Sequence, residues 1–235
     1  MDDAALLPAT ALAVVPGFNV PELRGLTLVL DFETMAAIYL GQITMWNDDR
    51  IKALNSIEVV AGLPVQPIIV ITQSISSSVT QAFTTALNLT VPEFSAQVGA
   101  GTLVSYPVQA DVNRSIVTGA VDGIMSNLRD VRYSFTTWLA YEILLSRTLG
   151  VVSLKKSDGT VVHPTVDSVK VALNDYLSSG SGLAYDLMLL GTTKHELSFA
   201  RLAAAHTHRH HRHQVKAQMP GRSPRLRRSS TGSAR

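Results

Sequence analysis

The sequence predicts an α/β fold, with a mixed sheet flanked by helices, followed by a disordered basic C-terminal tail. Apolar runs rich in β-branched residues alternate with segments of helical spacing, which is the pattern of strands layered against helices. Of the 235 residues, 46% are hydrophobic and 16% are charged, which is enough apolar material for a real core. Basic residues are concentrated near the C-terminal end, and this separates a tail from the folded body.

The formal net charge of +2 conceals two regions of opposite sign. Residues 1–191 contain 10 Lys and Arg against 17 Asp and Glu, whereas residues 192–235 contain 10 Lys and Arg against Glu196 alone. The second region also holds six of the seven histidines and has too little apolar surface to offset the entropy of ordering. We therefore expect a domain over residues 1–191 and a disordered His-, Arg- and Ser-rich tail over residues 192–235. Nucleic acid or another polyanion would bind only through this tail.

In the first half of the body, the strongest signal for a buried strand is the apolar run at residues 65–72. Shorter strands are predicted at residues 12–15 and 27–30. Asp31 stands where an N-cap is expected, ahead of a helix that Gly41 would end. A second, short helix is predicted at residues 48–54.

The second half of the body continues the alternation. Helical spacing begins at Val79, after a run of serines, and Pro92 opens a further helix. Ser157-Asp158-Gly159 has the chemistry of a hairpin turn. The remaining predicted elements are strands at residues 104–108, 133–137, 151–154 and 161–162, and helices at residues 115–128, 139–149 and 166–177.

The serine-rich turn between the run at residues 65–72 and the following helix is the candidate site. A strand that ends in small hydroxyl residues and starts a helix leaves unpaired N–H groups at the positive end of the helix dipole, which suits an oxyanion. The alternative is that Ser77 or Ser78 simply caps the helix. The candidate anion-binding residues are Ser74, Ser76, Ser77, Ser78, Val79 and Thr80.

Other chemistry finds little support in the sequence. The chain has no Cys, which excludes thiolate nucleophiles and cysteine metal sites. No phosphate loop, nucleophile elbow or His-Glu-x-x-His helix is present, and the acidic pairs Asp31/Glu33 and Asp48/Asp49 fall where helices start. The histidine run at residues 206–213 could chelate Zn or Ni ions but has no fixed geometry. We expect no catalytic residues, no cofactor and no metal site, and hence not an enzyme.

Five stretches of residues 13–165 share motifs with one known protein family. The segment Tyr39-Leu40-Gly41-Gln42-Ile43-Thr44-Met45-Trp46-Asn47-Asp48 is similar to the family signature Leu-Gly-Lys-Ile-Thr-x-Trp-Asn-Asp. We expect its Trp46 to pack in the core. The other stretches are Ala13-Val14-Val15-Pro16-Gly17-Phe18-Asn19-Val20-Pro21, Ala82-Phe83-Thr84-Thr85-Ala86-Leu87, Val98-Gly99-Ala100-Gly101 with Tyr106-Pro107-Val108, and Asp158-Gly159 with Pro164-Thr165. On these motifs, residues 13–165 resemble the phosphate-binding protein of the high-affinity phosphate ABC transporter, a class II periplasmic binding protein.

The resemblance implies a periplasmic-binding-protein-like lobe and a clamp that closes on phosphate or another small oxyanion. In the family, backbone amides, hydroxyls, one Arg and one acidic acceptor hold the ligand. The family's turn Arg-Ser-Asp-Gly-Ser-Gly-Thr-Thr is replaced here by residues 73–80, so that Gln73 stands for the Arg and Ile75 for the Asp. Losing both charged groups predicts weak binding with little preference for phosphate over sulfate.

The resemblance also implies a context. A periplasmic or extracellular location is expected, with a membrane transporter or a receptor as partner and a monomeric state. The matched region corresponds mainly to the second lobe of the family's clamp, and this chain is expected to start just after a Ser-Asp turn of the first lobe. No signal peptide or membrane-spanning segment is expected in this chain. Two alternatives remain, namely an extracellular sensor domain that no longer binds phosphate, and polyanion binding through the basic tail.

Overall fold

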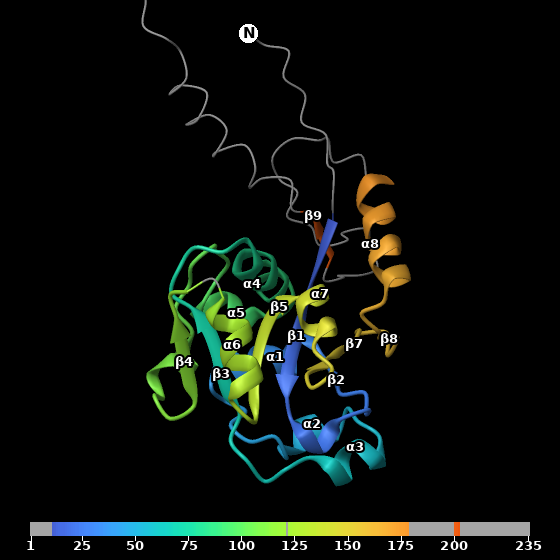
Figure 1. The fold of residues 1–235 in the computed structure, drawn as a ribbon. Helices are drawn as coiled ribbons and strands as arrows, with labels where there is room; N and C mark the ends of the chain where they lie inside the picture. The colour runs from blue at the N-terminus through green and yellow to red at the C-terminus, as the bar shows by residue number, and fades with distance from the viewer. Residues whose placement is uncertain (1–10, 121, 179–199, 203–235) are drawn as a thin grey trace, which may run out of the picture.

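The computed structural model describes residues 11–120, 122–178 and 200–202. Their centre is a six-stranded mixed sheet in the order β4-β3-β5-β1-β6, with β9 paired to another part of β1 (Figure 1). The strands are β1 (Ala11–Asn19), β3 (Ile69–Gln73), β4 (Ser115–Thr118), β5 (Ser134–Leu139), β6 (Gly150–Val151) and β9 (Ala200–Leu202).

The register of this sheet decides which strand ends meet. β3 runs parallel to β4 and β5, whereas β1 runs antiparallel to β5, with Phe18 opposite Phe135. The carboxyl ends of β3, β4 and β5 therefore lie at one edge of the sheet, and the carboxyl end of β1 lies at the other. The predicted mixed α/β fold is confirmed.

A second, smaller sheet joins β2 (Val29–Leu30), β7 (Ser153–Lys155) and β8 (Val161–Val162). β7 and β8 form an antiparallel hairpin, and Gly159 in its turn has φ +87°, a conformation that favours glycine. The hairpin turn predicted at Ser157-Asp158-Gly159 is confirmed.

Helices cover both faces of the larger sheet (Figure 1). α1 and α4 pack on one face and α6 and α7 on the other, with two core clusters divided between these faces. The helices are α1 (Phe32–Tyr39), α2 (Asp49–Lys52), α3 (Ile57–Gly62), α4 (Ser78–Thr90), α5 (Pro92–Gln97), α6 (Gly123–Asp130), α7 (Ala140–Leu145) and α8 (Val166–Ser178), with short 3₁₀ turns at Pro21–Leu23 and Pro107–Ala110.

The acidic residues at the predicted helix starts act as caps. The Asp31 carboxylate accepts a hydrogen bond from the Thr34 N–H at 2.8 Å, and the Asp48 carboxylate accepts one from the Arg50 N–H at 2.9 Å. Each carboxylate satisfies an N–H that would otherwise be unpaired in the first helical turn. The interpretation of these acids as structural residues is confirmed.

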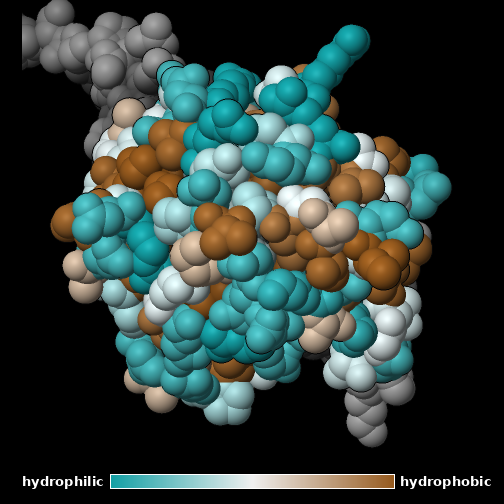
Figure 2. Space-filling model, turned by 90° about the horizontal axis from the view of Figure 1, so that it is seen from below, coloured by the Kyte–Doolittle hydropathy of each residue, from teal (hydrophilic) through white to brown (hydrophobic). Residues whose placement is uncertain are grey.

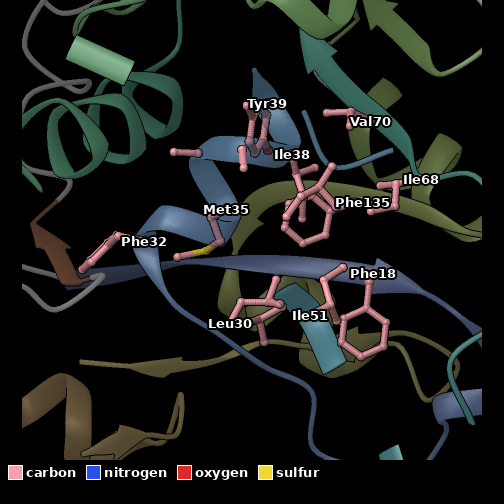
Figure 3. Close-up of a cluster of buried hydrophobic side chains, with 14 of the residues drawn as sticks. Phe18, Leu30, Phe32, Met35, Ile38, Tyr39, Ile51, Ile68, Val70 and Phe135 are labelled. Carbon is pink, nitrogen blue, oxygen red and sulfur yellow. The ribbon is translucent and has the colours of Figure 1, made fainter. Parts of the chain in front are cut away.

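The larger core cluster lies between α1, α4 and the sheet. Figure 3 shows Met35 and Ile38 of α1 directed toward Phe135 of β5 and Leu30 of β2. Trp46 is fully buried in the same cluster, and its indole N–H donates to the Tyr133 carbonyl at 2.9 Å. The packing role expected for Trp46 is confirmed.

Two predicted elements are wrong. Residues 104–108 form no strand, because Pro107 lacks an N–H for a ladder and the Gln109 side chain accepts from the Tyr106 N–H, which favours the 3₁₀ turn at Pro107–Ala110. Residues 115–128 are not one helix. Their first part is β4, where β-branched residues pair with β3, and α6 begins only at Gly123.

One helix boundary and one additional helix also differ from the prediction. The helix predicted at residues 139–149 ends at Leu145, and the helix at Ile57–Gly62 was not predicted. Ser56 caps this second helix through its hydroxyl, which the Val59 N–H approaches at 3.5 Å. A single capping serine gives too weak a local signal for a six-residue helix.

The surface of the molecule carries both apolar and hydrophilic side chains. Seen from below, apolar side chains form a broken band among hydrophilic ones (Figure 2). Among the described residues, no helix is both long enough and apolar enough to cross a membrane. Most of residues 192–235, including the histidine run, lie outside the described residues. The three residues of β9 pair antiparallel with β1, which differs from the structureless tail expected at that position.

Candidate anion-binding site

The candidate site lies where β3 passes into α4, at the edge where the parallel strands end. The Ser74 N–H donates to the Thr118 carbonyl at 2.9 Å and so continues the pairing with β4 beyond Gln73. The Ser77 N–H donates to the Thr102 carbonyl at 2.7 Å. The serine-rich turn is thus fixed at both ends by main-chain hydrogen bonds.

Ser77 is the N-cap of α4. Its backbone is extended, with φ −136° and ψ 136°, and its hydroxyl accepts from the Val79 N–H at 3.1 Å. The capping alternative is confirmed for Ser77. This internal bond occupies the Ser77 hydroxyl and the Val79 N–H, so that both serve to shape the first turn of the helix.

Several donors of the turn remain unpaired. Among the described residues, the main-chain N–H groups of Ser78 and Thr80 have no hydrogen-bond acceptor. The hydroxyls of Ser74, Ser76, Ser78 and Thr80 also lack a partner within that part of the chain. Ser74, Ser76 and Ser78 are exposed, and Thr80 is half-buried. These groups can donate to a ligand without breaking a hydrogen bond of the fold.

The electrostatics of the turn come from dipoles alone. Residues 73–80 include no charged side chain, and the first turn of α4 has no acidic residue. The 13 residues of α4 place the positive end of a helix dipole at Ser78. Neither the turn itself nor the first turn of α4 therefore offers an anion a full positive charge or a repelling carboxylate.

A small cavity of about 20 Å³ lies under the turn, which is room for about one water molecule. Gln73 and Thr80 line it together with Tyr39 of α1, Thr72 of β3 and Thr137 of β5. The Tyr39 and Thr137 hydroxyls lie 3.0 Å apart, and the Gln109 amide donates to the Thr72 hydroxyl at 2.8 Å. Because these hydroxyls bond to each other or to the fold, they support the turn and are not free ligand groups.

Burial governs the ionisation of the phenol beneath the site. Desolvation raises the pKa of Tyr39 far above its ordinary value, although the hydrogen bond with Thr137 acts in the opposite direction. Tyr39 therefore stays neutral across the physiological range. The sequence reasoning did not find Tyr39, Thr72 and Thr137, because they come from three separate elements and no local motif joins them.

The chemistry available at this site is binding. No residue of the turn pairs a nucleophile with a base, and the described residues hold no group of three or more metal-ligating side chains. Free N–H groups and hydroxyls at a helix start suit an oxyanion with several acceptor oxygens. Of the six candidate residues, four offer unpaired groups, and Ser77 and Val79 hold them in place.

Comparison with known proteins agrees with this architecture. Residues 9–179 match the family model described as a PBP superfamily domain. A protein of Acanthamoeba polyphaga mimivirus named as a serine/threonine-protein kinase/receptor is 37% identical over 178 residues, which are 74% of this chain and 11% of that protein. The phosphate-binding protein PstS of Methanocaldococcus jannaschii is 34% identical over 174 residues, 74% of this chain and 44% of that protein.

Solved structures show the same fold at lower identity. A high-affinity periplasmic phosphate-binding protein (PfluDING), solved with phosphate, aligns with TM-score 0.53 and 19% identity over 71% of this chain and 44% of its own. A human phosphate-binding apolipoprotein aligns with TM-score 0.52 and 19% identity over 71% of this chain and 46% of its own. The chain thus spans less than half the length of these proteins. The family match over residues 9–179 shows that the chain belongs to the PBP superfamily.

Proposed function

We propose that the chain binds a small oxyanion, with phosphate as the first candidate, at the turn between β3 and α4. The observation that carries this proposal is the set of unpaired donors at a helix start, the N–H groups of Ser78 and Thr80 and the neighbouring hydroxyls. The relatives named as phosphate-binding proteins support the choice of anion.

Each residue of the turn has a distinct role in this proposal. Ser78 and Thr80 donate through the main chain, while Ser74 and Ser76 add hydroxyl groups from the turn. Ser77 and Val79 position the first helical turn through the capping bond of 3.1 Å. The ligand meets neutral donors and the end of a helix dipole on this side only.

The absence of charge at positions 73 and 75 sets the affinity. A charge-assisted hydrogen bond contributes about 1.5–3 kcal/mol, so a site with Gln73 and Ile75 in place of Arg and Asp loses on the order of a hundredfold or more. We expect millimolar dissociation constants. Because Ile75 cannot accept the proton of hydrogen phosphate, sulfate should bind about as well.

A receptor module is the second candidate function. The mimivirus relative named as a kinase/receptor favours it, since this chain matches only 11% of that protein. The PBP domain would then be the ligand-sensing part of a larger receptor, and it acts by binding and without catalysis. A periplasmic or extracellular location, a monomeric state and a membrane transporter or receptor as partner belong to the same proposal.

A charge placed within the turn tests the site directly. Ser78→Asp puts a carboxylate at the first position of α4. The positive end of the helix dipole stabilises a negative charge there, so the fold should stay intact. We expect this variant to lose phosphate and sulfate binding. The measurement is a titration of the full chain with each anion, monitored by nuclear magnetic resonance. Ser95→Asp, with the same charge on exposed α5 beyond the other end of α4, is the matched control and should bind as the parent does.

The outcome separates the turn from the basic tail. Equal loss in both variants, or equal binding by both, would place the anion elsewhere in the chain, the tail included. Micromolar, phosphate-selective binding by the parent would contradict the uncharged site. A melting temperature within about 2 °C of the parent, measured for each variant, shows that the fold is retained.

A further inference from the structure

A second and larger pocket of about 330 Å³ lies away from the proposed oxyanion site. Phe18, near the carboxyl end of β1, lines it, together with residues 24–27, 147–151 and 163–165. In the sheet, Phe18 lies opposite Phe135, which in turn lies opposite Val70. Val70 is three residues before Gln73 along β3. Across the sheet, β6 is three strands away from β3. At the spacings of a β-sheet the two sites are roughly 15–20 Å apart.

The base of this pocket is apolar. Phe18 and Leu23 are buried, and Leu149 adds a half-buried side chain from the loop after α7. Gly150 pairs with Phe18, and a Cβ at this position would overlap the Phe18 ring. The glycine therefore leaves room for the tip of the Phe18 ring beside the backbone of β6. Figure 3 shows the ring of Phe18 at the edge of the core cluster.

The rest of the lining is cationic and polar. Arg24 and Arg147 are exposed and line the pocket, and neither guanidinium has an ion-pair partner in the described part of the chain. His163 bonds through Nδ1 to the Ser153 hydroxyl at 2.8 Å, which leaves its Nε2 free to face a ligand. The described lining contains no Asp or Glu.

Glu22 and Asp167, the acidic residues closest in sequence to Arg24 and to residues 163–165, already have partners. Glu22 lies 3.1 Å from the Tyr133 hydroxyl and 3.5 Å from Arg132. Asp167 pairs with Lys170 at 3.4 Å. Neither carboxylate is therefore held by Arg24 or Arg147. A pocket with unpaired guanidinium groups and no carboxylate attracts anions and disfavours metal cations.

We propose that this pocket binds a small organic anion that has an apolar body. Its volume lies at the lower end of the range of small-molecule sites, about 300–1,000 Å³. The apolar body packs against Phe18, Leu23 and Leu149, and the anionic head is held at the rim by Arg24 and Arg147. A bare inorganic anion would leave the apolar base unfilled, and a neutral apolar molecule would leave both guanidinium groups without a partner.

The test uses 4-phenylbutyrate as the probe and 4-phenylbutanol as its neutral counterpart, each titrated into the full chain. Amide signals of Thr27 and Gly150 report this pocket, and the amide signal of Ser78 reports the proposed oxyanion site. We expect 4-phenylbutyrate to shift Thr27 and Gly150 with a dissociation constant of about 1 mM, the affinity usual for a ligand of this size. The alcohol should bind at least about tenfold more weakly.

Two pairs of substitutions decide whether the rim holds the anion. Arg24→Gln with Arg147→Gln should weaken 4-phenylbutyrate binding at least about tenfold. Lys52→Gln with Arg129→Gln removes the same number of positive charges from surfaces outside the pocket. This pair should change the dissociation constant of 4-phenylbutyrate by less than about twofold. Equal loss in both double variants, equal binding of acid and alcohol, or no shift at Thr27 and Gly150 would each overturn the proposal.

The result is independent of the proposed oxyanion function. Ser78→Asp should leave 4-phenylbutyrate binding at Thr27 and Gly150 unchanged, even if phosphate binding is lost. Conversely, the Arg24 and Arg147 substitutions should leave the shift of Ser78 by phosphate in place. The failure of one site can therefore be told from the failure of the other.

Discussion

The segment at residues 40–48 keeps the signature of the family it resembles, whereas the turn at residues 73–80 departs from the family's turn, and the two segments are held in different ways. In the first segment, Ile43 and Trp46 are fully buried, and the Trp46 indole bonds to the Tyr133 carbonyl. In the turn, Ser74, Ser76 and Ser78 are exposed, and their hydroxyls have no partner among the described residues. The difference shows that core packing restricts which residues can stand in the signature segment. In the turn, charged residues can be replaced with little loss of stability.

The largest effect is expected where the signature segment enters the core. Trp46→Ala should lower the free energy of unfolding by about 3–5 kcal/mol, because it leaves a cavity beside Phe18 and Phe135 and removes one of the two hydrogen bonds that the Tyr133 carbonyl accepts. Urea unfolding of the full chain measures the change. Trp46→Phe keeps most of the packing and should cost clearly less.

A small effect of Trp46→Ala would contradict the packing role of the signature segment. A loss within about 1 kcal/mol would mean that the signature segment is not a determinant of the fold. Exposed Leu89 on α4 supplies the reference, since Leu89→Ala removes an apolar side chain without opening a core cavity and should change stability by no more than about 0.5 kcal/mol.

Alkaline pH should also destabilise the core, through its buried tyrosines. Burial raises the pKa of Tyr39 and of Tyr106 above the ordinary value of about 10 that each regains on unfolding. The stabilising contribution is therefore complete below pH 10 and is lost as the pH rises above it. Each buried phenol should lower the free energy of unfolding by about 1.4 kcal/mol per pH unit there.

Unfolding in urea between pH 8 and pH 11 measures this loss. Tyr39→Phe should cost about 1 kcal/mol at pH 8, through the lost hydrogen bond with Thr137, and should make the decline above pH 10 less steep. A decline as steep as that of the parent would show that Tyr39 ionises freely in the folded chain.

The two charged groups of the family's turn can be restored at positions 73 and 75. Gln73→Arg with Ile75→Asp should strengthen phosphate binding by about tenfold, a modest gain because charged groups in a one-sided, hydrated site are screened. The double variant should also prefer phosphate over sulfate more strongly than the parent does, since Asp can accept the proton of hydrogen phosphate. Calorimetric titration with both anions measures the change, and an unchanged ratio of the two affinities would contradict the role assigned to position 75.

The sequence predicted features that depend on neighbouring residues and missed those that depend on distant ones. The cap at Asp31, the serine turn and the hairpin at Gly159 follow from local chemistry. The sequence predicts a helix at Ser115-Ile116-Val117-Thr118, but these residues form β4 because they pair with Val70–Gln73. The layer of Tyr39, Thr72 and Thr137 under the turn could not be predicted, because the fold alone brings them together.

The smallest effect separates capping from binding within the turn. Ser77→Ala should cost about 1 kcal/mol of stability, because the Val79 N–H loses its acceptor. Ser78→Ala should leave stability within about 0.5 kcal/mol of the parent, since the Ser78 hydroxyl has no partner among the described residues, but it should weaken phosphate binding by about twofold to threefold. Thermal unfolding and phosphate titration of the same two variants give both quantities. If Ser78→Ala destabilised the chain as much as Ser77→Ala, the Ser78 hydroxyl would belong to the fold, and the proposed site would lose one of its exposed donors.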